Sequence, residues 1–357
     1  MAFNVQKLFT DVFNPETDET VLIIIDTARE KHKETPEWRL RHQMAIEWHK
    51  DIKALGKKRN FKVLPIVKYP ATFKHNADLP WGKGEPLNLN EALSKTTIAL
   101  ALTEFSASAP LINWSKSHPD FRCASMPMVT KDMEQTALVA DYKKVALRCQ
   151  ELKKILEDTQ GIDVVFSTGH RCYFDVRFRE CLTEDGNLPR DKQGFRLINL
   201  PSGETFYAPY EGEKGELSLT FGELPIRKNG ELVVFRVEEN SIVEVIGDGP
   251  HANEFKEFFA IDAARRNIAE CAFGTNPKAV VTGNVLEDEK AGFHWAYGRS
   301  DHIGGITGVN SFKSPENVVH FDWVYAKDSP IFVTEAKAIY EDNKTVTIIK
   351  NGDYSVF

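Results

Sequence analysis

Short apolar runs alternate with amphipathic stretches through the first half of the chain, and this rhythm constrains the fold more than any other feature of the sequence. Runs typical of buried strands lie at residues 21–26 (VLIIID), 61–67, 97–102, 121–126 and 161–167. Helices are predicted after Thr35, where a proline occupies the first helical position, and across residues 131–158. Strands that alternate with amphipathic helices predict an open, largely parallel α/β sheet. We expect this sheet to form an α/β domain of residues 1–195.

The rhythm changes after about residue 195, where short β-rich segments and tight turns take over. Asn-Gly pairs at 229–230 and 351–352 lie between strand-like runs, and Asn-Gly is the strongest short signal for a β-hairpin. Further strands are predicted at 242–246 and 345–350, and helices at 253–266 and 285–297. We expect residues 196–357 to form an α+β domain with a mixed, curved sheet. The first domain has neither a Gly-x-Gly-x-x-Gly motif nor a Walker sequence, so we interpret it as a scaffold or lid.

Charge and composition exclude several classes of protein. The net charge is −7 and no long basic run is present, which argues against a nucleic-acid partner. The longest apolar runs have the length of strands and are too short to cross a membrane. The N-terminus has no signal-peptide pattern, and the five cysteines are odd in number with no Cys-x-x-Cys pair. We therefore expect a cytoplasmic protein with reduced thiols and no membrane partner.

A histidine and an aspartate stand two residues apart in the apolar run VVHFDWVY, residues 318–325. Because side chains alternate faces along a strand, His320 and Asp322 share one face. The pair has two explanations. It is structural if the two groups satisfy each other or a nearby loop by hydrogen bonding. It is half of a metal site if further ligands lie close by in the fold.

Three more candidate ligands lie in the second half of the chain. Glu204 opens a strand-like segment after the turn LPSG, where an acid is usually solvated. Glu270 lies among small and apolar residues, where a carboxylate costs free energy unless it is paired or bound. His294 falls in the last turns of the helix predicted from a capping box of Asn284 and Glu287, where it either packs or interacts with the helix terminus.

Taken together and in this order, these motifs resemble those of the M29 metallopeptidases, the aminopeptidase T and aminopeptidase S type. The resemblance rests on Leu-Pro-x-x-Glu-x-Phe, an apolar strand with Glu270, Asp-Glu-x-Ala-x-x-His-x-Ala-x-Gly, and the final His-x-Asp. It is clearest over residues 196–325 and looser over 124–133 and 166–170. It implies a homodimeric hydrolase that acts on an N-terminal peptide bond of a short peptide or on a related small amide. It also implies five ligands for two divalent ions: Glu204, Glu270, His294, His320 and Asp322. Their mixed nitrogen and oxygen atoms suit zinc, cobalt or manganese.

The segment after His294 departs from the M29 pattern. Family members carry a tyrosine a few residues beyond this histidine, whereas here the chain reads GRSDHIGGITG over residues 298–308. Tyr297 lies nearby, and Asp301 and His302 occupy the expected region. We take Tyr297 and His302 as candidate catalytic residues. His302 either moves protons or lies in an exposed loop without a role.

Two other functions stay open on the sequence alone. The chain is also distantly similar to 2,5-dihydroxypyridine dioxygenases, which hold one iron(II) with two histidines and an aspartate. His320 and Asp322 would supply two of these ligands, and the third histidine corresponds to Glu270 here. The set of His294, His320 and Asp322 is itself a two-histidine, one-carboxylate set for one metal. A binding protein that kept the fold and lost catalysis is the third class, and the retained five-residue set argues against it.

Overall fold

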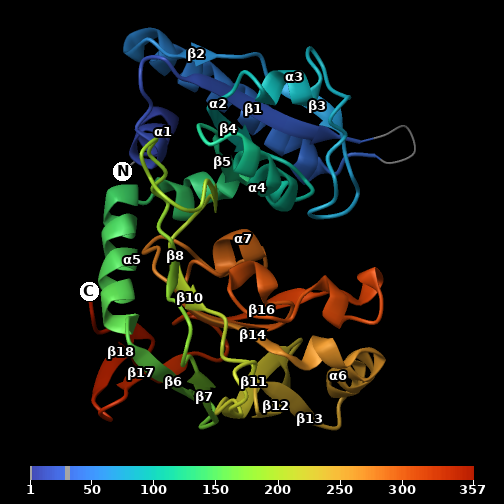
Figure 1. Ribbon diagram of the computed structural model, residues 1–357, viewed down its shortest axis with the longest axis vertical. Helices are drawn as coiled ribbons and strands as arrows, with labels where there is room; N and C mark the ends of the chain where they lie inside the picture. Colours follow the sequence, from blue (N-terminus) through green and yellow to red (C-terminus); the bar gives the residue numbers. More distant parts are fainter. Residues whose placement is uncertain (1, 29–32) are drawn as a thin grey trace. The chain divides into compact units, whose positions relative to one another are not determined.

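The computed structural model describes residues 2–28 and 33–357, and the chain forms two compact units (Figure 1). The first unit comprises Met1–Ala146, Glu184–Gly203 and Asn276–Ala279. The second comprises Leu147–Thr183, Glu204–Thr275 and Val280–Phe357. The chain therefore passes between the units several times, whereas the sequence analysis expects one boundary after residue 195. The reason is strand pairing, because two strands between residues 159 and 175 find their ladder partners in the second unit.

A parallel sheet forms the centre of the first unit, as the alternating sequence predicts. The strand order is β2-β1-β4-β5-β9, and β3 also pairs with β1; all these pairings are parallel. The strands are β1 (Thr20–Thr27), β2 (Lys62–Val63), β3 (Val67–Pro70), β4 (Ile98–Ala101), β5 (Arg122–Ser125) and β9 (Leu197–Asn199). The helices are α1 (Val5–Phe13), α2 (Pro36–Arg59), α3 (Leu89–Leu93) and α4 (Ser108–Ser117). Apolar side chains of β1, β4 and α3 meet in one buried cluster of this unit.

Two predicted elements near this sheet are broken or shorter. The strand expected over residues 61–67 divides into β2 and β3, because Pro65 has no N–H to donate to a ladder. The helix expected over residues 131–158 begins later, as α5 (Tyr142–Leu156). Two short 3₁₀ turns precede α5, and Thr136 between them leaves the helical region with φ −118° and ψ −114°.

Two sheets with antiparallel pairing form the second unit, where the sequence predicts one mixed sheet (Figure 1). The larger has the order β13-β12-β11-β7-β6-β17-β18-β19, and the smaller has the order β16-β15-β14-β10-β8. The larger sheet contains β6 (Thr159–Phe166), β7 (Arg171–Asp175), β11 (Phe221–Lys228), β12 (Glu231–Glu238), β13 (Ser241–Ile246), β17 (Val333–Tyr340), β18 (Thr345–Lys350) and β19 (Asp353–Tyr354). The smaller contains β8 (Leu182–Glu184), β10 (Glu204–Tyr207), β14 (Ile268–Gly274), β15 (Phe293–Gly298) and β16 (His320–Tyr325).

Helices α6 (Pro250–Ile261) and α7 (Val285–Asp288) complete the second unit. The helix expected over residues 253–266 is present as α6 with a 3₁₀ turn at 263–266. The strand expected over 161–167 is present as β6, but it belongs to the larger antiparallel sheet rather than to the parallel one. Among the described residues, no helix combines the length and the apolar character needed to cross a membrane.

Both predicted Asn-Gly hairpins are confirmed. Asn229 and Gly230 (φ 49° and 88°) connect β11 to β12, and Asn351 and Gly352 (φ 51° and 82°) connect β18 to β19. Both residues of each pair have positive φ, as a two-residue turn that matches the twist of its strands requires.

The predicted helix over residues 285–297 is wrong beyond Asp288. Helix α7 ends there, and Phe293–Gly298 forms strand β15 instead. Apolar residues in FHWAYG alternate with His294 and Ala296, which is the period of a strand. Pairing with β14 on one side and β16 on the other then outweighs the local helical signals.

The smaller sheet packs one of its faces against the larger sheet. Alternate side chains of β14, β15 and β16 enter one apolar cluster with residues of both sheets. Phe293 of β15, for example, meets the rings of Phe166 and Phe174 from the larger sheet. Because side chains alternate, the next residues along the same strands lie on the other face of the smaller sheet, and this face carries the polar groups described below.

Candidate metal centre

The polar face of the smaller sheet collects all five of the ligands expected from the sequence. Strand register places each of them beside a small residue on the neighbouring strand. Glu204 lies opposite Gly274, and His294 lies opposite Ala272. The same relation holds for the other three: Glu270 and Asp322 lie opposite Ala296, and His320 lies opposite Gly298. The glycines at two of these positions allow close approach of other backbone segments, since a Cβ on Gly274 would meet the backbone of Glu289 and Lys290, and a Cβ on Gly298 would meet Val319 O.

A β-bulge turns Glu270 toward the other ligands. In a regular strand Ile268 and Glu270 would share one face, because they are two residues apart. The register shifts between them, so that Ile268 enters the apolar core while Glu270 joins the polar face. An extra residue in one strand commonly redirects a side chain in this way beside functional sites.

The ligand atoms form two adjacent groups that share Glu270. In the Glu204 triad (Glu204, Glu270, His294) and in the Asp322 triad (Glu270, His320, Asp322), the candidate ligand atoms lie within 4.8 Å of one another. His294 Nε2 is 3.4 Å from Glu204 Oε2 and 3.8 Å from Glu270 Oε1. His320 Nε2 is 3.1 Å from Glu270 Oε2 and 3.7 Å from Asp322 Oδ1. Glu270 therefore directs one oxygen to each triad.

Backbone carbonyls fix the orientation of both histidines. Nδ1 of His294 is 3.2 Å from Gly292 O, and Nδ1 of His320 is 2.7 Å from Arg299 O. A carbonyl oxygen only accepts, so each Nδ1 is the donor and each Nε2 faces the carboxylates. In a neutral imidazole Nε2 carries a lone pair, which repels a carboxylate oxygen unless a proton or a cation lies between them. This arrangement of an outer carbonyl and an inward Nε2 is typical of metal-ligating histidines.

The carboxylates of the cluster favour the protonated form of both histidines. Burial alone would lower the pKa of His294 and His320, but the adjacent carboxylates outweigh it and hold both pKa values well above the usual range. Burial would raise the pKa of Glu270, yet the two histidines lower it below the usual range. Each group thus keeps its charged form because its neighbours carry the opposite charge.

Lys290 is a buried cation at this site that the sequence analysis does not identify. Its Nζ lies 2.6 Å from Glu204 Oε1 and 2.6 Å from Glu289 Oε1, and its side chain is fully buried. Glu204 Oε2, on the side of His294, is buried and makes no hydrogen bond. Burial raises the pKa of Glu289 to about 8, against the charge of Lys290, which lowers it, and with a smaller contribution from Glu204, which raises it. The only local signal for Lys290 is its place between an acidic run and an apolar strand.

His302 lies beside the centre on the loop of residues 299–309. Its ring centroid is 4.9 Å from that of His320, edge to face. The side chain is 44% exposed, and partial loss of solvent together with the neighbouring His320 lowers the pKa of His302 to about 4. Glu211 fixes the loop, because its carboxylate accepts hydrogen bonds from Ser300 Oγ, Ile306 N and Thr307 Oγ1. The structure therefore places His302 at the edge of the candidate centre.

Tyr297 does not join the cluster. It lies on the opposite face of β15 from His294, where its ring stacks on Phe321 and meets Phe258 and Phe259. Burial raises the pKa of its phenol. The sequence prediction of Tyr297 as a catalytic residue assumes a helix, on which it would lie close to His294. In a strand, an odd spacing puts the two residues on opposite faces.

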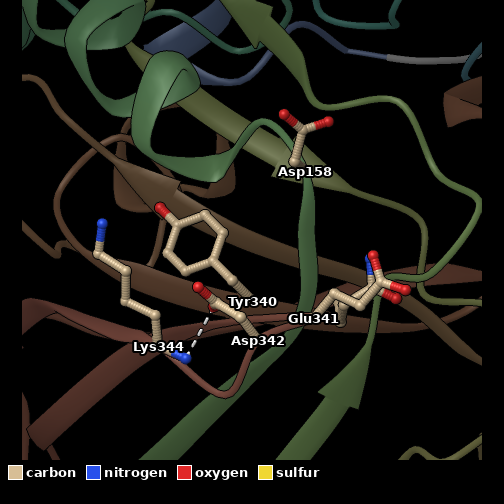
Figure 2. A pocket seen from close by; sticks show the side chains of 6 residues that line it. Asp158, Tyr340, Glu341, Asp342 and Lys344 are labelled. Atoms are coloured by element: carbon tan, nitrogen blue, oxygen red, sulfur yellow. Dashed lines mark hydrogen bonds between the residues drawn. The ribbon is translucent and has the colours of Figure 1, made fainter.

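A surface pocket of the second unit lies at the turn between β17 and β18 (Figure 2). Its lining residues are Asp158, Gln160, Tyr340, Glu341, Asp342 and Lys344. Asp342 accepts a hydrogen bond from Lys344 N at 3.0 Å, and the Tyr340 hydroxyl donates to Ile155 O. These polar groups hold the turn together. None of the five candidate ligands lines the pocket, so we assign it no part in the centre.

Solved structures with a similar fold are known, and the two described here share little sequence with this chain. No protein-family profile and no curated protein sequence matches the chain. AmpT from Thermus thermophilus is similar over 98% of this chain and 98% of its own, with a TM-score of 0.60 and 13% identity. The 2,5-dihydroxypyridine dioxygenase from Pseudomonas putida KT2440 is similar over 98% of this chain and 96% of its own, with a TM-score of 0.64 and 16% identity. The chain thus has a two-domain α/β fold like that of these proteins.

Proposed function

We propose that this protein is a metal-dependent, aminopeptidase-like hydrolase with a centre for two divalent ions. The observation that carries the proposal is the shared carboxylate of Glu270, which directs one oxygen to each of two adjacent triads. A carboxylate between two groups of ligands is the arrangement expected for a pair of ions a few ångströms apart.

The side chains present suit such ions. The three carboxylates and two imidazoles form a mixed oxygen and nitrogen set that fits zinc, cobalt or manganese. The buried Glu204 Oε2 has no hydrogen bond, so a cation would satisfy it. Both inward Nε2 atoms face carboxylates, where a bound ion would replace a proton. Two bound ions would supply an acidified water and would polarise the carbonyl of the substrate.

The residues around the centre have separate roles in this proposal. Glu270 holds the two triads at a fixed separation, and the carbonyls of Gly292 and Arg299 keep the histidines aimed inward. His302, on the loop held by Glu211, stands at the edge of the centre, where it contacts the substrate. With a pKa of about 4 it is neutral near pH 7 and a weak base, so it offers the substrate a hydrogen bond rather than a proton transfer.

The similarity of the fold to that of AmpT supports the proposed aminopeptidase-like activity. On this basis we propose an N-terminal peptide bond of a short peptide, or a related small amide, as the substrate. A homodimer in the cytoplasm, with no nucleic-acid partner, belongs to the same proposal.

The second candidate is a ring-cleaving dioxygenase with one iron(II), favoured by the similarity to 2,5-dihydroxypyridine dioxygenase. Such a centre would need two histidines and one carboxylate around one ion. His320 and Asp322 group with Glu270 here, whereas His294 groups with Glu204. This distribution of ligands favours the hydrolase.

Activity toward the two kinds of substrate tests the proposal. Protein treated with a chelator and reloaded with zinc, cobalt or manganese is assayed with aminoacyl p-nitroanilides, and iron-loaded protein is assayed for oxygen uptake with 2,5-dihydroxypyridine. We expect ion-dependent release of nitroaniline that Glu270→Ala abolishes and Glu244→Gln, an exposed carboxylate on β13, leaves unchanged. Oxygen uptake without anilide hydrolysis would replace the hydrolase with the dioxygenase.

A further inference from the structure

The two triads differ in the charge around them. In the Glu204 triad, the ammonium of Lys290 lies 2.6 Å from Glu204 Oε1, which leaves only Oε2 facing His294. In the Asp322 triad, among the ion pairs of the described residues, the partner of Asp322 is His320 at 3.7 Å. Among the ion pairs of the described residues, the Glu204 triad therefore has a lysine partner, and the Asp322 triad has no lysine or arginine partner.

We propose that Lys290 makes the two ion positions unequal, so that the Asp322 triad binds its ion first and more tightly than the Glu204 triad. This inference rests on the proposed two-ion function and adds an order of filling to it. Lys290 is a positioning residue here, because it acts through Glu204 rather than on a substrate.

Two physical effects of Lys290 weaken the Glu204 position. The ammonium occupies Oε1, so Glu204 offers an ion one oxygen instead of two. Its positive charge also repels a divalent ion across a few ångströms of buried space, where screening by solvent is small. Glu289 Oε1 also lies 2.6 Å from Nζ, but this contact does not release Oε1 of Glu204.

Calorimetric titration of the chelator-treated protein with Zn²⁺ or Mn²⁺ tests the order directly. We expect two dissociation constants that differ by at least about tenfold, which corresponds to about 1.4 kcal/mol. His320→Ala should remove the tighter constant, and His294→Ala should remove the weaker one. These two variants assign each constant to its triad without any measurement of activity.

Variants of Lys290 test the cause. Lys290→Met keeps the length of the side chain and removes the charge, so the weaker constant should tighten by about tenfold or more while the tighter one changes little. Lys290→Arg keeps the charge and should keep the order. Lys327→Met is the matched control, because Lys327 pairs with Asp353 on the surface of the same unit and its loss changes the net charge equally.

The outcomes separate this inference from the proposed function. Two equal constants in the wild type, loss of the tighter ion in His294→Ala, or wild-type constants in Lys290→Met would each overturn the inference alone. If Lys290→Met does not fold, the assignment by the two histidine variants decides the order. A protein that binds no divalent ion at all overturns the proposed function and this inference together.

Discussion

Glu270→Gln tests most directly whether Glu270 is a ligand shared by two ions or an acid with a structural role only. Glutamine keeps the shape of the side chain and removes the charge that faces both triads. Glu270 is 7% exposed, so its interaction with an ion is that of a buried charge pair. Removing one partner of such a pair costs about 2–5 kcal/mol of binding free energy. At 1.4 kcal/mol per factor of ten, each ion should bind about 30-fold to a few thousand-fold more weakly.

Competition with a chromophoric chelator measures this loss for both ions in one titration. The matched control is Glu244→Gln, since Glu244 pairs with Arg236 on the surface of the same unit and its side chain is 48% exposed. We expect wild-type affinities for the control and weakened affinities at both positions for Glu270→Gln. If one ion keeps its wild-type affinity, Glu270 is not shared between the triads. If both keep it, Glu270 is not a ligand.

Three further predictions follow from the same geometry. Glu211→Ala removes the acceptor of three hydrogen bonds from the loop of residues 299–309. We therefore expect faster limited proteolysis of this loop and a kcat about tenfold lower. An unchanged rate of proteolysis would show that Glu211 does not fix the loop. Tyr297→Phe should keep kcat within about twofold, because the ring faces the apolar core, and a large loss would return Tyr297 to the site. Folding raises the pKa values of His294 and His320, so protonation of these histidines stabilises the chelator-treated protein. This stabilisation is complete below pH of about 6.5, the usual pKa of histidine, and is lost as the pH rises through the pKa values of the folded state. The melting temperature of the chelator-treated protein should therefore fall from pH 6 to pH 8.5, and it should fall less in His320→Gln. A melting temperature that rises with pH would contradict this prediction.

Features that depend on neighbouring residues are the ones that can be predicted from this sequence. Thr35 caps α2 by accepting a hydrogen bond from Trp38 N, as the Thr-Pro pair indicates. Both Asn-Gly turns form, and the alternation of apolar runs and helices gives the parallel sheet. The side chains expected to share a metal centre also lie together in the structure. They could be predicted because their motifs and the order of these motifs are distinctive, even though the identity to solved structures is low.

Features that depend on distant partners could not be predicted. The segment around His294 follows a helical cap, and the strand-like alternation in FHWAYG spans only 6 residues, so its pairing with β14 and β16 decides for a strand. The bulge that turns Glu270 to the polar face leaves no local signal. Lys290 gains its importance from Glu204, which lies 86 residues earlier in the chain.

The number of divalent ions per chain tests the central claim most directly. Elemental analysis is made on protein dialysed against zinc, cobalt or manganese, and on His294→Ala treated in the same way. Two ions per wild-type chain and one per His294→Ala chain are the expected result, because His294 belongs to one triad only. A single ion per wild-type chain that His294→Ala retains, or no bound ion under any of these conditions, would contradict the two-ion centre.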